Sequence, residues 1–116
     1  MCAWSEDLHI GKRSYGWEFN FQAIEEDDYF NIPQISTKKQ WFEYLINHKD
    51  EIFNEYDENI SFREFIDIVE TASPGTIRQD GHKLLNHYDE CIRKDGYCDH
   101  SYKDEEGYNM STVEFS

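Results

Sequence analysis

Two cysteines and a histidine near the C-terminus have types and a spacing that could do chemistry. Cys91, Cys98 and His100 flank the dipeptide Asp95-Gly96, which is typical of a two-residue hairpin turn. Such a turn would place Cys91 opposite His100, with Cys98 diagonal on the same face. Thiolates and imidazole are ligands of Zn²⁺, so the pattern predicts a structural zinc site.

The fourth zinc ligand has several candidates. We expect His87 to complete the set, and His82, His9 or Cys2 are alternatives. The Cys91 to Cys98 spacing matches no familiar zinc signature, so the other interpretation stays open: half-buried thiols and ordinary histidines without a metal.

Catalysis is not expected. Cys98 and His100 are neighbours of the kind that can form an activated thiolate, but a catalytic pair also needs an orienting third group and a pocket. Gly11-Lys12 does not continue into a phosphate loop, because Arg13 stands where that motif requires Ser or Thr. No catalytic residue is assigned, and the chain is expected to be a binding protein rather than an enzyme.

The charge is strongly negative, with 25 Asp and Glu against 11 Lys and Arg, a net charge of −14. Nucleic acids and anionic membranes select basic surfaces, so direct binding to either is not expected. Two interpretations of the acidity remain. It serves solubility and repels wrong partners, or it engages a basic groove on a partner protein, such as a groove that normally holds a phosphate backbone.

The segment 40–70 is the most polarised part of the chain. It holds nine Asp and Glu against two Lys and Arg, so its net charge is −7. Aromatic residues lie among these carboxylates, which makes the segment our candidate for a partner-binding surface. The residues assigned to that surface are Glu43, Tyr44, Asp50, Glu51, Glu55, Tyr56, Asp57 and Glu58.

The elements that must position these residues are strands and two helices. Residues 8–22 predict a β-hairpin, since Trp17, Phe19 and Phe21 alternate with polar residues. The acidic stretch 25–28 is expected to be a solvated loop. Capping boxes predict one helix after Thr37, with a stripe from Trp41 to Ile46 and Lys49 near its end, and a second from Ser61 to the Ser73-Pro74-Gly75 break.

The C-terminal third is expected to be an antiparallel meander. Residues 82–94 also fit a helical stripe, but the Asp95-Gly96 signal favours strand from about residue 88, paired with 97–103. A turn at 104–107 then leads into a last strand, 108–115. The prediction is a single α+β domain over residues 1–116, an antiparallel sheet packed with two helices.

The length and the cysteine content of the chain indicate its core size and its cellular compartment. A chain of 116 residues with 8 Phe, 8 Tyr and 3 Trp can build one modest core. No apolar run approaches the roughly 18 residues of a membrane span, and the start lacks the features of a leader. Three cysteines fit free thiols or a metal site in a reducing, cytoplasmic compartment.

One block of residues resembles a known family. His9-Ile10-Gly11-Lys12, Ser14, Gly16-Trp17 and Phe19 resemble a signature of small bacteriophage and prophage proteins without an assigned function, and the closing Glu114-Phe115-Ser116 is similar too. A cysteine pair often precedes that block, whereas here only Cys2 does. The resemblance implies a phage origin and carries over no catalytic residue.

The expected function follows from these observations together. Small acidic phage proteins commonly act on host or defence proteins, so we expect an accessory protein that binds and modulates or inhibits such a target in the host cytoplasm. The alternative is a zinc-stabilised structural or assembly module without inhibitory activity.

Overall fold

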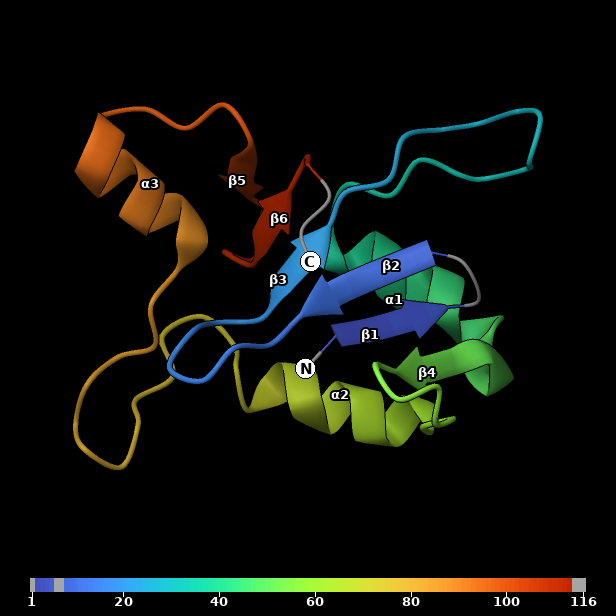
Figure 1. Ribbon diagram of the computed structural model, residues 1–116, viewed down its shortest axis with the longest axis horizontal. Helices are drawn as coiled ribbons and strands as arrows, with labels where there is room; N and C mark the ends of the chain where they lie inside the picture. The colour runs from blue at the N-terminus through green and yellow to red at the C-terminus, as the bar shows by residue number, and fades with distance from the viewer. Residues whose placement is uncertain (1, 6–7, 114–116) are drawn as a thin grey trace.

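The computed structural model describes residues 2–5 and 8–113 and shows one mixed six-stranded sheet with helices around it (Figure 1). The strands are β1 (Cys2–Ser5), β2 (Leu8–Lys12), β3 (Asn20–Gln22), β4 (Ile52–Asn54), β5 (Ser101–Lys103) and β6 (Asn109–Ser111). Their order is β4-β1-β2-β3-β6-β5. All neighbours are antiparallel except β3 and β6, which are parallel. The expected α+β class is confirmed, with this mixed pairing in place of a wholly antiparallel sheet.

The N-terminal hairpin forms as predicted. β2 and β3 pair antiparallel with Gly11 opposite Phe21 and Lys12 opposite Asn20. Gly16 has a φ of 83°, a left-handed conformation that suits glycine in the connection. Gly11 instead lies inside β2, where a Cβ would collide with the Phe19 ring and the Asn20 carbonyl. Glycine there permits the close approach of β3.

The expected polar face of this hairpin is not solvated. Glu18, Asn20 and Gln22 are buried, as are Phe19 and Phe21. The chain around residue 85 covers the first of them, since the Glu18 amide donates to the Leu85 carbonyl at 2.7 Å. The alternation of residue types is real, but it marks two different buried environments rather than a buried and an exposed face.

Both predicted helix starts are confirmed. Helix α1 spans Lys38–Ile46, and the Thr37 hydroxyl accepts from the Gln40 amide at 3.1 Å. Helix α2 spans Phe62–Glu70, and the Ser61 hydroxyl accepts from the Glu64 amide at 3.0 Å. Both helices are shorter than expected, because α1 ends before Lys49, which begins the 3₁₀ turn η1 (Lys49–Glu51), and α2 ends before Ser73.

The core lies between the sheet and these two helices. Trp41 and Leu45 of α1, Phe65 and Val69 of α2, and sheet residues such as Phe21 are fully buried in one cluster. Figure 1 shows α1 behind the strands and α2 along their lower edge. Aromatic contacts join the two helices directly, since the Phe42 ring lies 5.8 Å from that of Phe62.

The prediction of a strand from residue 88 is wrong, because residues His87–Asp95 form helix α3. The Asn86 side chain caps its start, and Glu90 pairs with Arg93 and Lys94 one turn later. Gly96 has a φ of 77° and donates its amide to the Ile92 carbonyl, a left-handed helix end. Asp-Gly suits a hairpin turn and a helix C-terminus equally well, and the contacts of Asn86 and Asn109 with the start of α3 decide for the helix.

The chain after α3 forms one hairpin rather than a meander. β5 and β6 pair antiparallel around a turn at 104–107, as predicted for that turn. The strands are shorter than the expected 97–103 and 108–115, and residues 114 and 115 lie outside the described residues. β6 then joins β3, which brings α3 and β5 to the far end of the sheet (Figure 1).

The acidic stretch 25–28 belongs to an excursion that we call the aromatic arm, residues 24–35. Two isolated bridges hold its sides together, Ile24 with Ile35 and Asp27 with Ile32. Figure 1 shows it extending beyond the sheet at the upper right.

Among the described residues, no helix is long and apolar enough to cross a membrane.

Candidate metal centre and acidic surface

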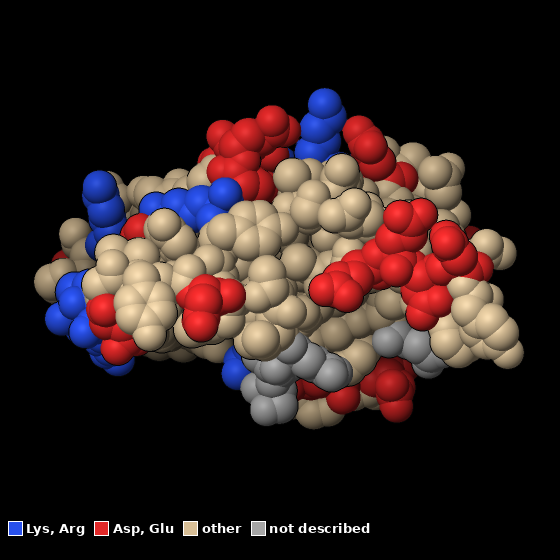
Figure 2. Space-filling model, turned by 90° about the horizontal axis from the view of Figure 1, so that it is seen from above, with Lys and Arg blue, Asp and Glu red and all other residues tan. Residues whose placement is uncertain are grey.

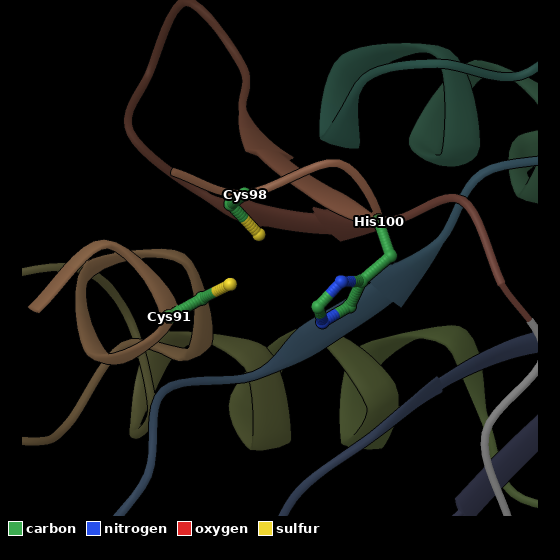
Figure 3. A group of neighbouring side chains, drawn as sticks. All are labelled: Cys91, Cys98 and His100. Carbon is green, nitrogen blue, oxygen red and sulfur yellow. The ribbon is translucent and has the colours of Figure 1, made fainter. Parts of the chain in front are cut away.

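The structure brings Cys91, Cys98 and His100 together in what we call the cysteine–histidine cluster (Figure 3). Their potential ligand atoms all lie within 4.8 Å of one another. Figure 3 shows the two sulfur atoms facing each other, with the imidazole ring of His100 beside them. Both cysteines are half-buried free thiols and His100 is exposed, so the cluster lies at the surface.

The three residues come together as predicted, but through a helix and the segment that follows it rather than through a hairpin. Cys91 lies at the middle of α3, and Cys98 and His100 lie in the segment 96–100 that leads from α3 into β5. The left-handed end at Gly96 reverses the chain, so that this segment passes beside the helix. A thiol contact reflects this reversal, since Cys91 Sγ donates to the Tyr97 carbonyl at 3.3 Å.

The two thiols have opposite tendencies to ionise. The hydrogen bond with Cys98, together with burial, raises the pKa of the Cys91 thiol to about 11. Burial alone would raise the pKa of Cys98, but the neighbouring Cys91 thiol, the amides of His100 and Ser101 and the Ser101 side chain lower it on balance. Cys98 is thus the thiol whose anionic form the protein stabilises, and a thiolate is the form that binds metal.

The other proposed ligands lie elsewhere. His87, expected as the fourth ligand, opens α3, and its ring stacks on Trp17 at a centroid distance of 4.3 Å. His9 stacks on Trp4 in the same way at 4.4 Å. His82 lies in the irregular segment before α3, and Cys2 lies in β1. Among the described residues, the cluster offers three candidate ligands.

His87 makes folding stability depend on pH. Burial, and then the positive charge of Lys12, lower the pKa of His87 below its ordinary value of 6.5. Between that lowered pKa and 6.5 the unfolded chain binds more protons than the folded one. This contribution to stability is therefore present above pH 6.5 and is lost as the pH falls.

We expect wild-type protein to lose more stability than His87→Phe when the pH drops from 7 to 5. Phenylalanine keeps a ring against Trp17 and has no proton to bind. Urea unfolding at both pH values, with chelator present throughout, measures the difference. Equal losses for the two proteins would contradict the role given to His87.

The eight residues of the predicted partner-binding surface, which we call the acidic surface, lie along one continuous stretch of chain. Glu43 and Tyr44 are on α1, Asp50 and Glu51 are in η1, and residues 55–58 form the turn after β4. The Asn59 side chain donates to the Asp50 carbonyl at 2.9 Å and to the Ile52 carbonyl at 3.1 Å. These bonds tie the turn to η1 at the β4 edge of the sheet.

The side chains of the acidic surface face solvent. Tyr56 is 74% exposed, and Glu43, Asp50, Glu55, Asp57 and Glu58 are exposed as well. Glu51 and Tyr44 are half-buried, and the Tyr44 ring stacks on His48 at 4.0 Å. Asn54 shapes the turn, because its side-chain oxygen accepts from the amides of Tyr56 and Glu58.

The carboxylates of this region have no cationic partner within the described chain. Ion pairs within 4.0 Å involve Glu106, Asp80, Glu90, Asp99 and Asp89, all outside residues 40–70. Lys49 and Arg63, the two cations of the segment, form no described ion pair with its nine carboxylates. The negative charge of this surface is therefore uncompensated, whereas the α3 end of the molecule is locally neutralised.

Sequence reasoning missed the tip of the aromatic arm. Tyr29 is 88% exposed and Phe30 is 68% exposed, and their rings pack edge to face at 4.8 Å. The Asp27 carboxylate accepts from both of their amides, which fixes the turn. Figure 2 shows Asp and Glu side chains gathered at the right, where the arm lies in Figure 1, and mixed charges at the left. Two adjacent aromatics beside an acidic run were the available signal.

A cavity of about 750 Å³ was also missed. It lies between the turn of the N-terminal hairpin and the irregular segment 71–84, and Arg13, Tyr15, Trp17 and Arg78 are among its lining residues. Arg78 pairs with Asp80 and lies over the Tyr15 ring at 5.3 Å. The cavity shares no residue with the cluster or the acidic surface. The sequence carried no signal for it, because its walls come from distant segments.

Comparison with known proteins adds no further assignment: no protein-family model, no curated protein and no solved structure matches this chain.

Proposed function

We propose that this chain is a small acidic accessory protein that binds a partner protein through the acidic surface. The observation that carries the proposal is the uncompensated charge of residues 40–70, where no carboxylate forms an ion pair within the described chain. Charges left unpaired in the free protein are available to a partner without first breaking an internal contact. Complementary charge across an interface speeds encounter and fixes orientation.

The partner should carry a basic surface with room for an aromatic side chain. Tyr56 projects from the acidic turn at 74% exposure, and tyrosine is enriched among the residues that dominate interface energy. A groove that ordinarily holds a nucleic-acid backbone has the required positive charge. The resemblance to phage proteins directs the choice of partner to host or defence proteins, which binding would modulate or inhibit.

The test is a charge-neutralising variant of the turn, Glu55→Gln, Asp57→Asn and Glu58→Gln. Asp57 has a φ of 59°, a conformation that asparagine tolerates, so the turn should be preserved. Exposed ion pairs contribute about 0.2–1 kcal/mol each, so losing three should weaken binding roughly tenfold. The wild-type chain is first used to capture its partner from bacterial lysate, and the partner is purified. Calorimetry then measures the affinity of this partner for the wild-type chain and for the variant at several salt concentrations.

A matched control removes the same charge elsewhere. Glu25→Gln, Glu26→Gln and Asp28→Asn neutralise three carboxylates of the aromatic arm and leave Asp27, which fixes its tip. We expect this variant to bind almost as wild type does, and we expect nucleic acid to compete with the chain for the partner. If the affinity for the partner changes neither with salt concentration nor in the variant of residues 55–58, the proposal is contradicted. If only the variant of residues 25–28 loses affinity, the interface lies on the aromatic arm instead.

A further inference from the structure

The cysteine–histidine cluster has the donor set and spacing of a transition-metal site. In a tetrahedral zinc site with bonds of about 2.0–2.3 Å, the ligand atoms are about 3.3–3.8 Å apart. The cluster's ligand atoms already lie within 4.8 Å of one another. The ligand atoms would have to approach one another by at most about 1.5 Å to reach this geometry. The side chains that would move lie at the surface.

The chemistry of the donors selects the metal. A bound metal ion would deprotonate both thiols. Two thiolates and one imidazole are soft to borderline ligands, which favour Zn²⁺ over Mg²⁺ and Ca²⁺. Asp99 Oδ1 lies 3.2 Å from His100 Nδ1. A carboxylate at that nitrogen holds its proton and leaves Nε2 free to coordinate, the usual arrangement behind a zinc-bound histidine.

Helix α3 has little tertiary packing of its own, so a metal ion that joins it to the neighbouring chain would stabilise it. Among its described residues none is fully buried, and a nine-residue helix is marginal without tertiary packing. Its first half is attached, through the Asn86 cap and through an ion pair from Lys103 to Asp89 at 2.8 Å. At its middle, Cys91 contacts the segment 96–100, since its Sγ donates to the Tyr97 carbonyl.

We propose that Cys91, Cys98 and His100 bind one Zn²⁺, with water as the fourth ligand, and that the ion joins the middle of α3 to the segment entering β5. The described residues supply three ligands, and a solvent ligand in the fourth position is the pattern of an open zinc site. The chain is then a metal-stabilised module. This inference uses none of the residues of the acidic surface and does not depend on a partner protein.

The experiment measures metal directly in the full-length chain. Purified wild type is analysed for zinc after desalting, then stripped and titrated with Co²⁺, whose charge-transfer and ligand-field absorption report thiolate ligation and tetrahedral geometry. We expect about one zinc per chain and thiolate-to-cobalt bands. Zinc should also raise the melting temperature of the stripped protein, and chelator should reverse that rise.

Substitutions test whether metal binding depends on the cysteine–histidine cluster or on any cysteine of the chain. Cys98→Ser should weaken cobalt binding by more than about 100-fold, since loss of even an outer-shell partner costs about 10–100-fold. Cys2→Ser is the matched control, the same change at the thiol outside the cluster, and it should bind as wild type does. His100→Ala keeps both thiols, so it tests the imidazole if Cys98→Ser fails to fold. Wild-type protein without zinc or thiolate bands, or equal losses in Cys2→Ser and Cys98→Ser, would overturn the proposal.

Discussion

Replacing Trp41 by alanine should lower the free energy of unfolding by about 3–5 kcal/mol. The side chain is 0% exposed in the centre of the core, and its indole N–H donates to the Gln22 carbonyl at 2.8 Å. The substitution removes a large buried ring and leaves that carbonyl without its donor. Because small domains have a total stability of only about 5–15 kcal/mol, the variant should be largely unfolded at moderate temperature.

Two comparison variants test whether the loss of stability comes from the burial of the Trp41 ring. Trp41→Phe keeps a ring in the core and loses the hydrogen bond to Gln22, so it should lose less stability than Trp41→Ala. Ile46→Ala changes an apolar residue on the same helix that is 52% exposed, and it should cost about 0.5 kcal/mol or less. Urea unfolding followed by circular dichroism measures all three. Similar losses at positions 41 and 46 would show that α1 does not pack as described.

Replacing Asn109 by alanine should cost about 2–3 kcal/mol. Asn109 is 0% exposed, its side-chain amide donates to the side-chain oxygen of Asn20, and its own oxygen accepts from the Tyr88 amide at 2.7 Å. The variant leaves the buried Asn20 oxygen unsatisfied and loosens the start of α3. Since α3 carries Cys91, cobalt binding by this variant should weaken as well.

An exposed asparagine provides the control for this substitution. Asn47→Ala removes a side chain at the end of α1 whose amide makes one long bond, 3.4 Å, to the Glu43 carbonyl. It should change stability by about 0.5 kcal/mol or less and leave cobalt binding unchanged. If Asn109→Ala were equally mild, the buried amide network could not be what docks α3 on the sheet.

Local patterns in the sequence were sufficient where the structure depends on local interactions. Thr37 and Ser61 begin helices because a hydroxyl reaches an amide three residues later, a contact that needs no other part of the chain. The hairpin of β2 and β3 is also local, and so is the exposure of the turn at 55–58. The charge of the acidic surface is a property of composition, and it was readable before any fold was known.

Tertiary structure decided the parts in which distant segments compete. Asp95-Gly96 favours both a hairpin turn and a helix end, and the choice of helix depends on Asn86 and Asn109, which dock the start of α3. The parallel pairing of β3 with β6 joins segments far apart in sequence, and it buries the polar residues Asn20 and Asn109. Of these two, Asn20 is a polar position of the alternating pattern, which by itself indicated an exposed face.

The candidate metal centre shows both contributions. The sequence by itself determined which side chains can coordinate a metal, because Cys91, Cys98 and His100 lie near a residue that reverses the chain. Only the tertiary structure decided that the reversal follows a helix rather than a strand, and that His87 stacks on Trp17 instead of joining the cluster. The physical reason is that donor chemistry belongs to residue types, whereas convergence depends on packing between segments that no local pattern encodes.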